Sequence, residues 1–319
     1  MSQGSDGDRA FGGLAQLIHA ADYGVLLPLL ARLPLAAGYA MSAWRGWLNG
    51  RAGRDWRSVA LGSRHVARQS AAGYRMLNPK ADEETVRAWV RARFAAESRE
   101  EFEGRLMAAG RAGELRRSVG PENFLRACLA RERGLLLLTP HFDSFTLGVA
   151  FLGLAGVKVN LMSSAITNDS RVTPSVRRHF FRKYRGMERF MNGGRVLDQE
   201  AGLRPFYRML ERKESVVILA DAPAVSRNAT VAPHFLGARR LLAGGGMRMA
   251  QRTGSDIGAF VCRYAGPGRY RLEGGPILRA EDPAAPDAVY GFLSGAILES
   301  PGRWWAADLL PAMTPVENS

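Results

Sequence analysis

From residue 134 onward, short apolar runs alternate with helical patterns along the chain. The runs are continuous rather than alternating, as in strands that are buried on both faces of a sheet; they are Leu135–Thr139, 157–162, 215–220, Ile257–Tyr264 and a shorter one at Tyr270–Glu273. The stretches between and after them are expected to be helices, at about 145–154, 173–184, 204–212, 244–252 and 288–299. Alternating strands and helices predict an α/β domain over 134–310, with a mixed, mainly parallel sheet flanked by helices.

Before residue 134, apolar residues recur at helical spacing among polar ones. Asp82 is a helix-capping residue type, Glu83 and Glu84 favour a helix N-terminus, and an apolar stripe at helical spacing follows as far as Glu97. A second helix is expected over about 123–133, stopped by Gly134. We therefore predict a helical region over 61–133.

The N-terminal segment is apolar in an unusual way. Residues 23–41 are strongly apolar but contain Arg32 and two prolines, so they lack the about 18 uninterrupted apolar residues of a spanning helix. Trp44 and Trp47 follow, among several arginines, a pattern that is typical of a membrane interface. We expect membrane-associated helices over 21–60; a buried helical hairpin is the alternative. Residues 1–20 are interpreted as a disordered lead and 311–319 as a tail.

The composition is globular and strongly basic. The net charge is +14 and the pI about 10.6, and 40 of the 44 basic residues are arginine. An arginine-rich surface attracts phosphates, anionic lipid headgroups and acidic proteins. Nucleic acid is a third option, but neither zinc-finger spacing nor an RNA-binding aromatic strand accompanies the charge. Cys128 and Cys262 lie far apart in apolar runs, which suggests buried free thiols in a reducing compartment.

Candidate catalytic residues follow two of the predicted strands. His141 follows Leu135–Thr139, and α/β sheets build their sites at the carboxyl ends of strands. A histidine can take a proton from an alcohol at neutral pH, although a structural histidine in a turn is the alternative. Asp143 or Ser144 could cap the helix that follows. Asp221 ends the strand at 215–220 and could share the rim with His141, or could cap a helix instead.

Other kinds of site are not indicated. Gly244–Gly246, with Arg239, Arg240 and Arg248 nearby, is a weak signal for anion binding. The motifs of serine hydrolases, dithiol proteins, zinc proteases and P-loop enzymes are missing, and the five histidines lack metal-ligand spacing. We predict neither a metal nor a cofactor.

Taken in order, these features resemble the lipid A secondary acyltransferases and the related phosphatidylinositol mannoside acyltransferases. The resemblance spans about residues 20–310 and rests on motif order: His141 after a buried strand, an arginine-rich helix (Arg177, Arg178, Arg182, Arg185), Asp221 at a strand end, Pro233–Gly237, Gly244 to Gly254, and Pro301–Trp305. It implies a glycerolphosphate-acyltransferase-like fold and a setting on the cytoplasmic face of a bacterial inner membrane.

The resemblance also implies a reaction. His141 would be the general base for a hydroxyl or amine of a lipid-like acceptor, which attacks the thioester of an acyl carrier protein or coenzyme A donor. Arg182, Arg185 and Arg248 are the candidate anion contacts. A basic surface suits an acidic carrier protein and an anionic membrane surface.

One position departs from the family pattern. The family has an acid five residues after its histidine, and here that position holds Thr146. Asp143, on a helix, would point roughly 200° away from His141, so Asp221 is the other candidate partner. The alternative function is a catalytically inactive relative that binds lipid or carrier protein. A carboxylate within hydrogen-bonding distance of His141, about 3 Å, would favour the enzyme.

Overall fold

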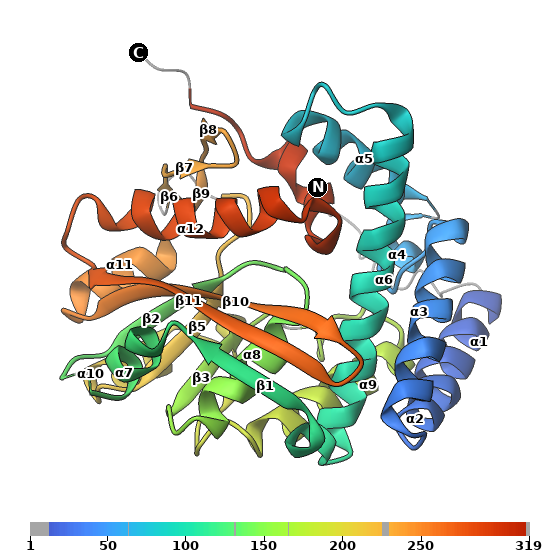
Figure 1. The fold of residues 1–319 in the computed structure, drawn as a ribbon, viewed down its shortest axis with the longest axis horizontal. Coiled ribbons are helices and arrows are strands. Elements are labelled where there is room, and N and C mark those ends of the chain that lie inside the picture. The colour runs from blue at the N-terminus through green and yellow to red at the C-terminus, as the bar shows by residue number, and fades with distance from the viewer. Residues whose placement is uncertain (1–12, 63, 131, 165, 225–229, 317–319) are drawn as a thin grey trace, which may run out of the picture.

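The computed structural model describes residues 13–62, 64–130, 132–164, 166–224 and 230–316. A twisted seven-stranded sheet forms the centre, with helices on both of its faces, and the N-terminal helices form a separate layer beside it (Figure 1). The strand order is β1-β11-β10-β2-β5-β3-β4.

The described α-helices are α1 (Gly13–Ala21), α2 (Leu27–Leu30), α3 (Leu35–Ala52), α4 (Ser58–Leu61), α5 (His65–Leu77), α6 (Glu83–Ala108), α7 (Glu122–Ala130), α8 (Phe145–Leu154), α9 (Pro174–Glu188), α10 (Arg204–Glu211), α11 (Gly245–Arg252) and α12 (Ala285–Glu299). Shorter helical turns are η1 (Asp22–Leu26), η2 (Arg111–Glu114), η3 (Gln199–Ala201), η5 (Pro301–Arg303) and η6 (Ala307–Ala312). The strands of the sheet are β1 (Arg116–Gly120), β2 (Leu135–Thr139), β3 (Val159–Ser163), β4 (Val196–Asp198), β5 (Ser215–Leu219), β10 (Asp256–Gly266) and β11 (Arg269–Arg279). Four two-residue strands form two small ribbons: β6 (Thr230–Val231), β7 (His234–Phe235), β8 (Ala238–Arg239) and β9 (Leu242–Ala243).

The predicted mainly parallel sheet is confirmed. Only β10 and β11 pair antiparallel within the seven-stranded sheet, and the other pairs of neighbours run parallel. All residues of β2 are buried, as its continuous apolar run predicts. β2 pairs with β5 in a register that aligns Thr139 with Leu219, so the two strands end at the same level of the sheet.

Two expectations for the first 133 residues are wrong. β1, which the sequence did not predict, lies inside the region that we expected to be helical; it is a polar edge strand, which pairs with β11. Of the expected disordered lead, residues 13–20 belong to α1, and residues 1–12 lie outside the described residues.

Helix α6 extends past the expected end at Glu97 because its second half buries polar side chains. Asp82 caps the helix as expected, accepting a hydrogen bond of 2.7 Å from the Thr85 amide. The buried charged residues of α6 are Arg93, Glu97, Glu100, Glu101, Glu103 and Arg105. Glu100 and Glu101 pair with cations on other segments, Lys183 of α9 and Arg45 of α3, whereas Arg93 and Glu97 pair with each other. A purely apolar stripe is therefore the wrong signal for this helix, which lies between the N-terminal layer and the sheet.

The N-terminal layer is packed on one side and apolar on the other. Gly46 of α3 sits so close to α6 that an added Cβ would lie 2.7 Å from the Cα of Ala95. The opposite side exposes large apolar residues, among them Leu17, Val25, Leu29, Met41, Trp44, Trp47 and Leu48. Within the described ranges, no helix combines the length and the apolar character needed to cross a bilayer.

The segment after α12 folds back against α5. The Tyr74 hydroxyl donates a 2.9 Å hydrogen bond to the Trp304 carbonyl, and Trp304 is fully buried. At Gly73 the backbone of η6 comes so close that an added Cβ would lie 1.9 Å from the Ala307 carbonyl oxygen. This glycine therefore permits the contact that holds residues 304–307 in place.

Replacing Gly73 by alanine is expected to destabilise the protein by about 2 kcal/mol or more, because η6 or α5 must move to admit the methyl group. The melting temperature should fall by several degrees in a thermal unfolding experiment. Gly291 of α12 is the control, since an added Cβ meets nothing within 4 Å there and alanine favours the helix. A Gly73→Ala melting temperature no lower than that of Gly291→Ala would contradict this packing.

Candidate active site

His141 and Asp221 meet at the carboxyl edge of the sheet. His141 follows β2 and Asp221 follows β5, and the hydrogen bond of 3.0 Å from the Ala220 amide to the Thr139 carbonyl continues the pairing beyond the strand. The parallel register thus carries both side chains to one rim. His141 Nδ1 lies 2.8 Å from Asp221 Oδ1, and the His141 backbone amide donates a 2.8 Å hydrogen bond to Oδ2.

Asp221 is an ionised group inside the protein. Its side chain is fully buried, whereas that of His141 is 24% exposed. Burial alone would raise the pKa of the carboxyl, but the charge of His141 and the hydrogen bonds from His141 and Trp304 outweigh it and lower the pKa below its usual value. The carboxylate is therefore the stable form, and it fixes His141 Nδ1 as the protonated ring nitrogen.

The two C-terminal tryptophans complete the rim. The Trp304 indole donates a 2.7 Å hydrogen bond to Asp221 Oδ2, so three N–H groups converge on one carboxylate. The Trp305 amide donates to the His141 carbonyl at 3.0 Å. The Trp305 ring meets the imidazole edge-on, with 5.0 Å between the ring centroids. The tryptophans thus position the histidine from behind and from the side.

Asp143, the other expected partner, points elsewhere. It adopts a positive φ of 50°, and its carboxylate contacts Arg99, the Tyr264 amide at 2.9 Å and Arg303 at 2.8 Å. It neither bonds His141 nor caps α8. Ser144 holds the N-cap position of α8, but its hydroxyl donates to Glu103 at 2.9 Å, so the expected side-chain cap is wrong for both residues.

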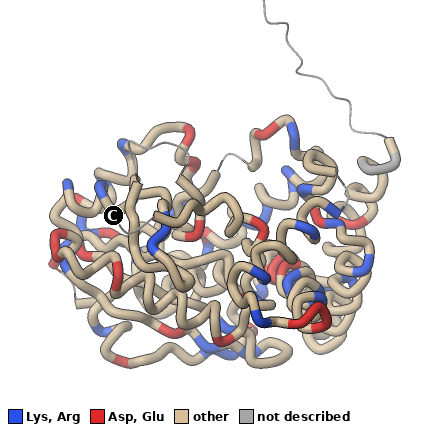
Figure 2. The backbone as a smooth tube through the Cα atoms, turned by 90° about the horizontal axis from the view of Figure 1, so that it is seen from above, with Lys and Arg blue, Asp and Glu red and all other residues tan. Residues whose placement is uncertain are grey.

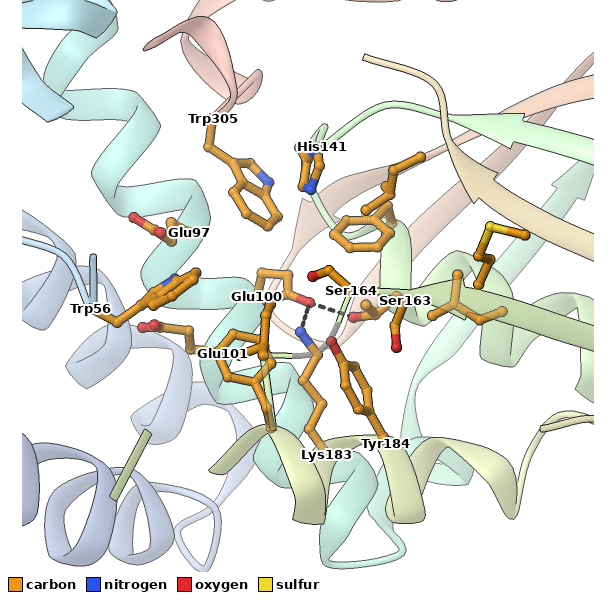
Figure 3. A pocket seen from close by; sticks show the side chains of 17 residues that line it. Trp56, Glu97, Glu100, Glu101, His141, Ser163, Ser164, Lys183, Tyr184 and Trp305 are labelled. Carbon is orange, nitrogen blue, oxygen red and sulfur yellow. Dashed lines mark hydrogen bonds and ion pairs between the residues drawn. The ribbon is translucent and has the colours of Figure 1, made fainter. Parts of the chain in front are cut away.

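A pocket of about 600 Å³, counting its open mouth, lies beside His141. The imidazole points into it from one end (Figure 3). One wall is charged and polar and comes from α6 and α9: Glu97, Glu100, Glu101, Lys183 and Tyr184. The remaining lining is mainly apolar and includes Phe145, Leu161, Met162, Ile166, Phe180 and Leu219.

Thr146, which occupies the position of the family's acid, is bonded to a carboxylate of another helix. Its hydroxyl donates a 2.6 Å hydrogen bond to Glu100 Oε1, and the Lys183 ammonium forms a buried ion pair with the same oxygen (Figure 3). A carboxylate is therefore present beside Thr146, but it is supplied by α6. Sequence reasoning missed both charged residues; the only signal was that Lys183 is one of four lysines in an arginine-rich chain.

The three arginines expected to bind anions do not line this pocket. Arg182 and Arg185 lie on the exposed side of α9, where Arg185 pairs with Glu188 at 3.2 Å. Arg248 is exposed on α11. Two of the glycines before it serve packing, because an added Cβ would lie 2.5 Å from the Thr230 backbone at Gly244 and 2.3 Å from the Ile218 side chain at Gly246. Anion binding by the three arginines stays a prediction, and it would take place at the surface of the molecule.

This arrangement suits proton transfer. A buried carboxylate that holds one ring nitrogen of a histidine leaves the other nitrogen to act as a base, as in other base–orienter pairs. Within the described ranges, no three His, Cys, Asp or Glu side chains come together in a way that could hold a metal ion. The chemistry offered by the described residues is thus the transfer of a proton to and from a group bound in the pocket.

Comparison with known proteins agrees with the motif order. Residues 80–292 match the family model described as bacterial lipid A biosynthesis acyltransferase. This range contains His141, Asp221 and most of the pocket. No curated protein matches the chain.

The Asp143→Asn substitution is expected to destabilise the protein by about 2–3 kcal/mol, because it removes the nearer of the two buried carboxylates that pair with Arg99; Glu103 lies farther away, at 3.6 Å. Asparagine tolerates the positive φ at this position, so backbone strain does not confuse the result. Urea unfolding measures the change. Glu122→Gln is the control, since the Glu122 side chain is 87% exposed and its ion pair should contribute little. Equal stability of the two variants would show that Asp143 does not have this structural role.

Proposed function

This chain belongs to the bacterial lipid A biosynthesis acyltransferase family, and we propose that it moves an acyl chain from a thioester donor to a hydroxyl or amine of a lipid-like acceptor. The single observation that carries the mechanism is the 2.8 Å contact between His141 Nδ1 and the buried Asp221 carboxylate. It supports an enzyme over an inactive binding relative, although Thr146 replaces the acid of the family pattern.

In the proposed reaction, His141 Nε2 takes the proton of the acceptor as its oxygen or nitrogen attacks the thioester carbonyl carbon. Asp221 holds the ring and stabilises the imidazolium that forms. The tetrahedral intermediate then collapses, the carbon–sulfur bond breaks, and the imidazolium returns the proton to the leaving thiolate. The products are an acyl ester or amide and a free thiol.

The donor is proposed to be an acyl carrier protein or acyl-coenzyme A. Both are anionic, and the protein carries a net charge of +14. Its basic residues are spread over the molecule, with acidic residues among them (Figure 2). Arg182, Arg185 and Arg248 are the proposed contacts for donor or lipid anions, in keeping with their exposure. The apolar pocket wall supports an acyl chain as the transferred group.

The proposed location is the cytoplasmic face of a bacterial inner membrane. Trp44 and Trp47 are 51% and 49% exposed on α3. The Arg51 guanidinium lies 5.4 Å from the centre of a Trp47 ring. Exposed tryptophans with adjoining cations favour the headgroup layer of an anionic bilayer. In this orientation, α3 would lie on the membrane rather than cross it.

Replacing His141 by alanine is expected to abolish acyl transfer, and Asp221→Asn is expected to slow it by about 100-fold or more, since each removes part of the base. Mass spectrometry of membranes from cells that express each variant measures the acylated product. His234→Ala is the control, because His234 is exposed on β7 and outside the pocket. Transfer that survives in His141→Ala would overturn the mechanism.

Replacing Trp44 and Trp47 together by serine is expected to weaken binding to phosphatidylglycerol-containing vesicles by about tenfold or more, because two large interfacial side chains are lost. Vesicle co-sedimentation measures the bound fraction. The control is Leu298→Ser, which removes a side chain of similar exposure (48%) from α12. If both variants bind vesicles as well as the native protein, α3 is not the membrane contact.

A further inference from the structure

The pocket is polar at the end that lies away from His141. In Figure 3 the imidazole enters at one end, and the side chains of Lys183 and Tyr184 rise from α9 into the other. The Phe145 ring adjoins both ends: its centre is 5.7 Å from the centre of the imidazole and 5.9 Å from Lys183 Nζ. An acyl chain that starts at His141 and fills the pocket would therefore pass Phe145 and reach the polar end.

Two partly buried hydroxyl groups line the pocket there, those of Tyr184 and Ser163. The hydrogen bond between them lowers the pKa of Tyr184, but burial and the charge of Glu100 raise that pKa more, so the phenol stays protonated. The Ser163 hydroxyl also donates to the Leu197 carbonyl, at the long distance of 3.4 Å. Each hydroxyl oxygen has two lone pairs, so the two oxygens can accept a further hydrogen bond.

The Lys183 ammonium supplies donors at the same place. It has three N–H groups, and it pairs with Glu100 Oε1, the oxygen that also accepts from Thr146. The rings of Phe145 and Phe180 lie 5.9 and 5.3 Å from Nζ, and aromatic faces attract a cation without using its hydrogen bonds one by one. Among the residues that the structure describes, no second carboxylate pairs with this lysine. Donors therefore remain for a ligand in the pocket.

A plain alkyl chain suits the polar end poorly. It would exclude water from an ammonium group and two hydroxyl groups without offering them a hydrogen bond in return, which is unfavourable. A hydroxyl on the chain can accept from Lys183 and donate to Tyr184 or Ser163. A charged substituent fits less well, because Lys183 and Glu100 already neutralise each other.

We propose that the transferred acyl group carries a hydroxyl on its distal part, and that Tyr184, Ser163 and Lys183 form the subsite that binds this hydroxyl. The identification of the bound chain as the acyl group rests on the proposed function. A hydroxyl on carbon 3 does not meet this requirement, because it lies two carbons from the thioester carbonyl and stays with it at the His141 end.

The geometry limits the position of the hydroxyl along the chain. The two distances through Phe145, laid end to end, place Lys183 Nζ at most about 12 Å from the imidazole, and an extended chain advances roughly 1.2 Å per bond. The hydroxyl is therefore expected within about ten bonds of the carbonyl carbon.

The test is a competition among thioesters of decanoic acid and its 3-, 8- and 10-hydroxy derivatives, offered both on coenzyme A and on an acyl carrier protein. Membranes with the full native chain supply the acceptor, and mass spectrometry of the products gives the ratios of kcat/KM. At least one of the two distal hydroxy chains is expected to be transferred about tenfold or more in excess of decanoyl, because a hydrogen-bonding site rejects an analogue that leaves its groups unpaired. Decanoyl transfer that equals or exceeds both would overturn the proposal.

Matched variants locate the preference. Tyr184→Phe keeps the ring and removes its hydroxyl, and Ser163→Ala removes the other hydroxyl; each is expected to lower the preference for the distal hydroxy chain about fivefold or more. Tyr207→Phe is the control, because Tyr207 is partly buried on α10 and outside the pocket. A preference that survives unchanged in both Tyr184→Phe and Ser163→Ala would overturn the subsite.

Binding of the free acids separates the subsite from the function. Isothermal titration calorimetry compares decanoate with its 8- and 10-hydroxy derivatives on the full native chain. Transfer without a preference among the thioesters would overturn the subsite and leave the acyltransferase standing. Tighter binding of a distal hydroxy acid without transfer from any thioester would overturn the proposed function, and with it the identification of the bound chain as the acyl group. Equal binding and no transfer would overturn both.

Discussion

The buried carboxylate of Asp221 is the group on which the site depends. Removing a carboxylate from water costs several kcal/mol unless other groups replace the solvent. Here the replacement comes from three N–H groups on two segments: two on His141 after β2 and one on Trp304 after α12. The same hydrogen bonds that make the charge tolerable also bring the histidine, the strand end and the C-terminal segment together. These hydrogen bonds consequently determine both the stability of the buried charge and the geometry of the site.

The buried charges of helix α6 likewise need partners, and more residues are involved. Its buried carboxylates are matched by cations, some on other elements, such as Arg45 of α3 and Lys183 of α9, and some on α6 itself, such as Arg93. A buried charge without its partner is strongly destabilising, so such pairs discriminate against other ways of packing the helices. The pocket takes its acidic residues from this helix, while its apolar residues come from several elements, among them β3, β5, α8 and α9.

The sequence predicted the elements that bury apolar side chains. The run at Leu135–Thr139 identified β2, and the positions of His141 and Asp221 after neighbouring strands suggested their shared rim. The second half of α6 buries polar residues and the edge strand β1 is largely exposed, so neither has an apolar pattern and both were missed. On α9 the sequence drew attention to arginines, but residues 180, 183 and 187 form the buried face, and their spacing was the better guide. The choice between Asp143 and Asp221 needed the backbone, because a positive φ turns Asp143 away.

The order of these residues along the chain has a consequence for synthesis. Trp304 follows Asp221 by 83 residues, and Trp305 is the aromatic neighbour of His141. A growing chain that has emerged only as far as β11 holds the histidine and the aspartate but leaves the carboxylate one donor short. The reacting groups are therefore assembled only after α12 has been made and has allowed the following segment to fold back. Translation thus delays the chemistry until after the last strand of the sheet has been made.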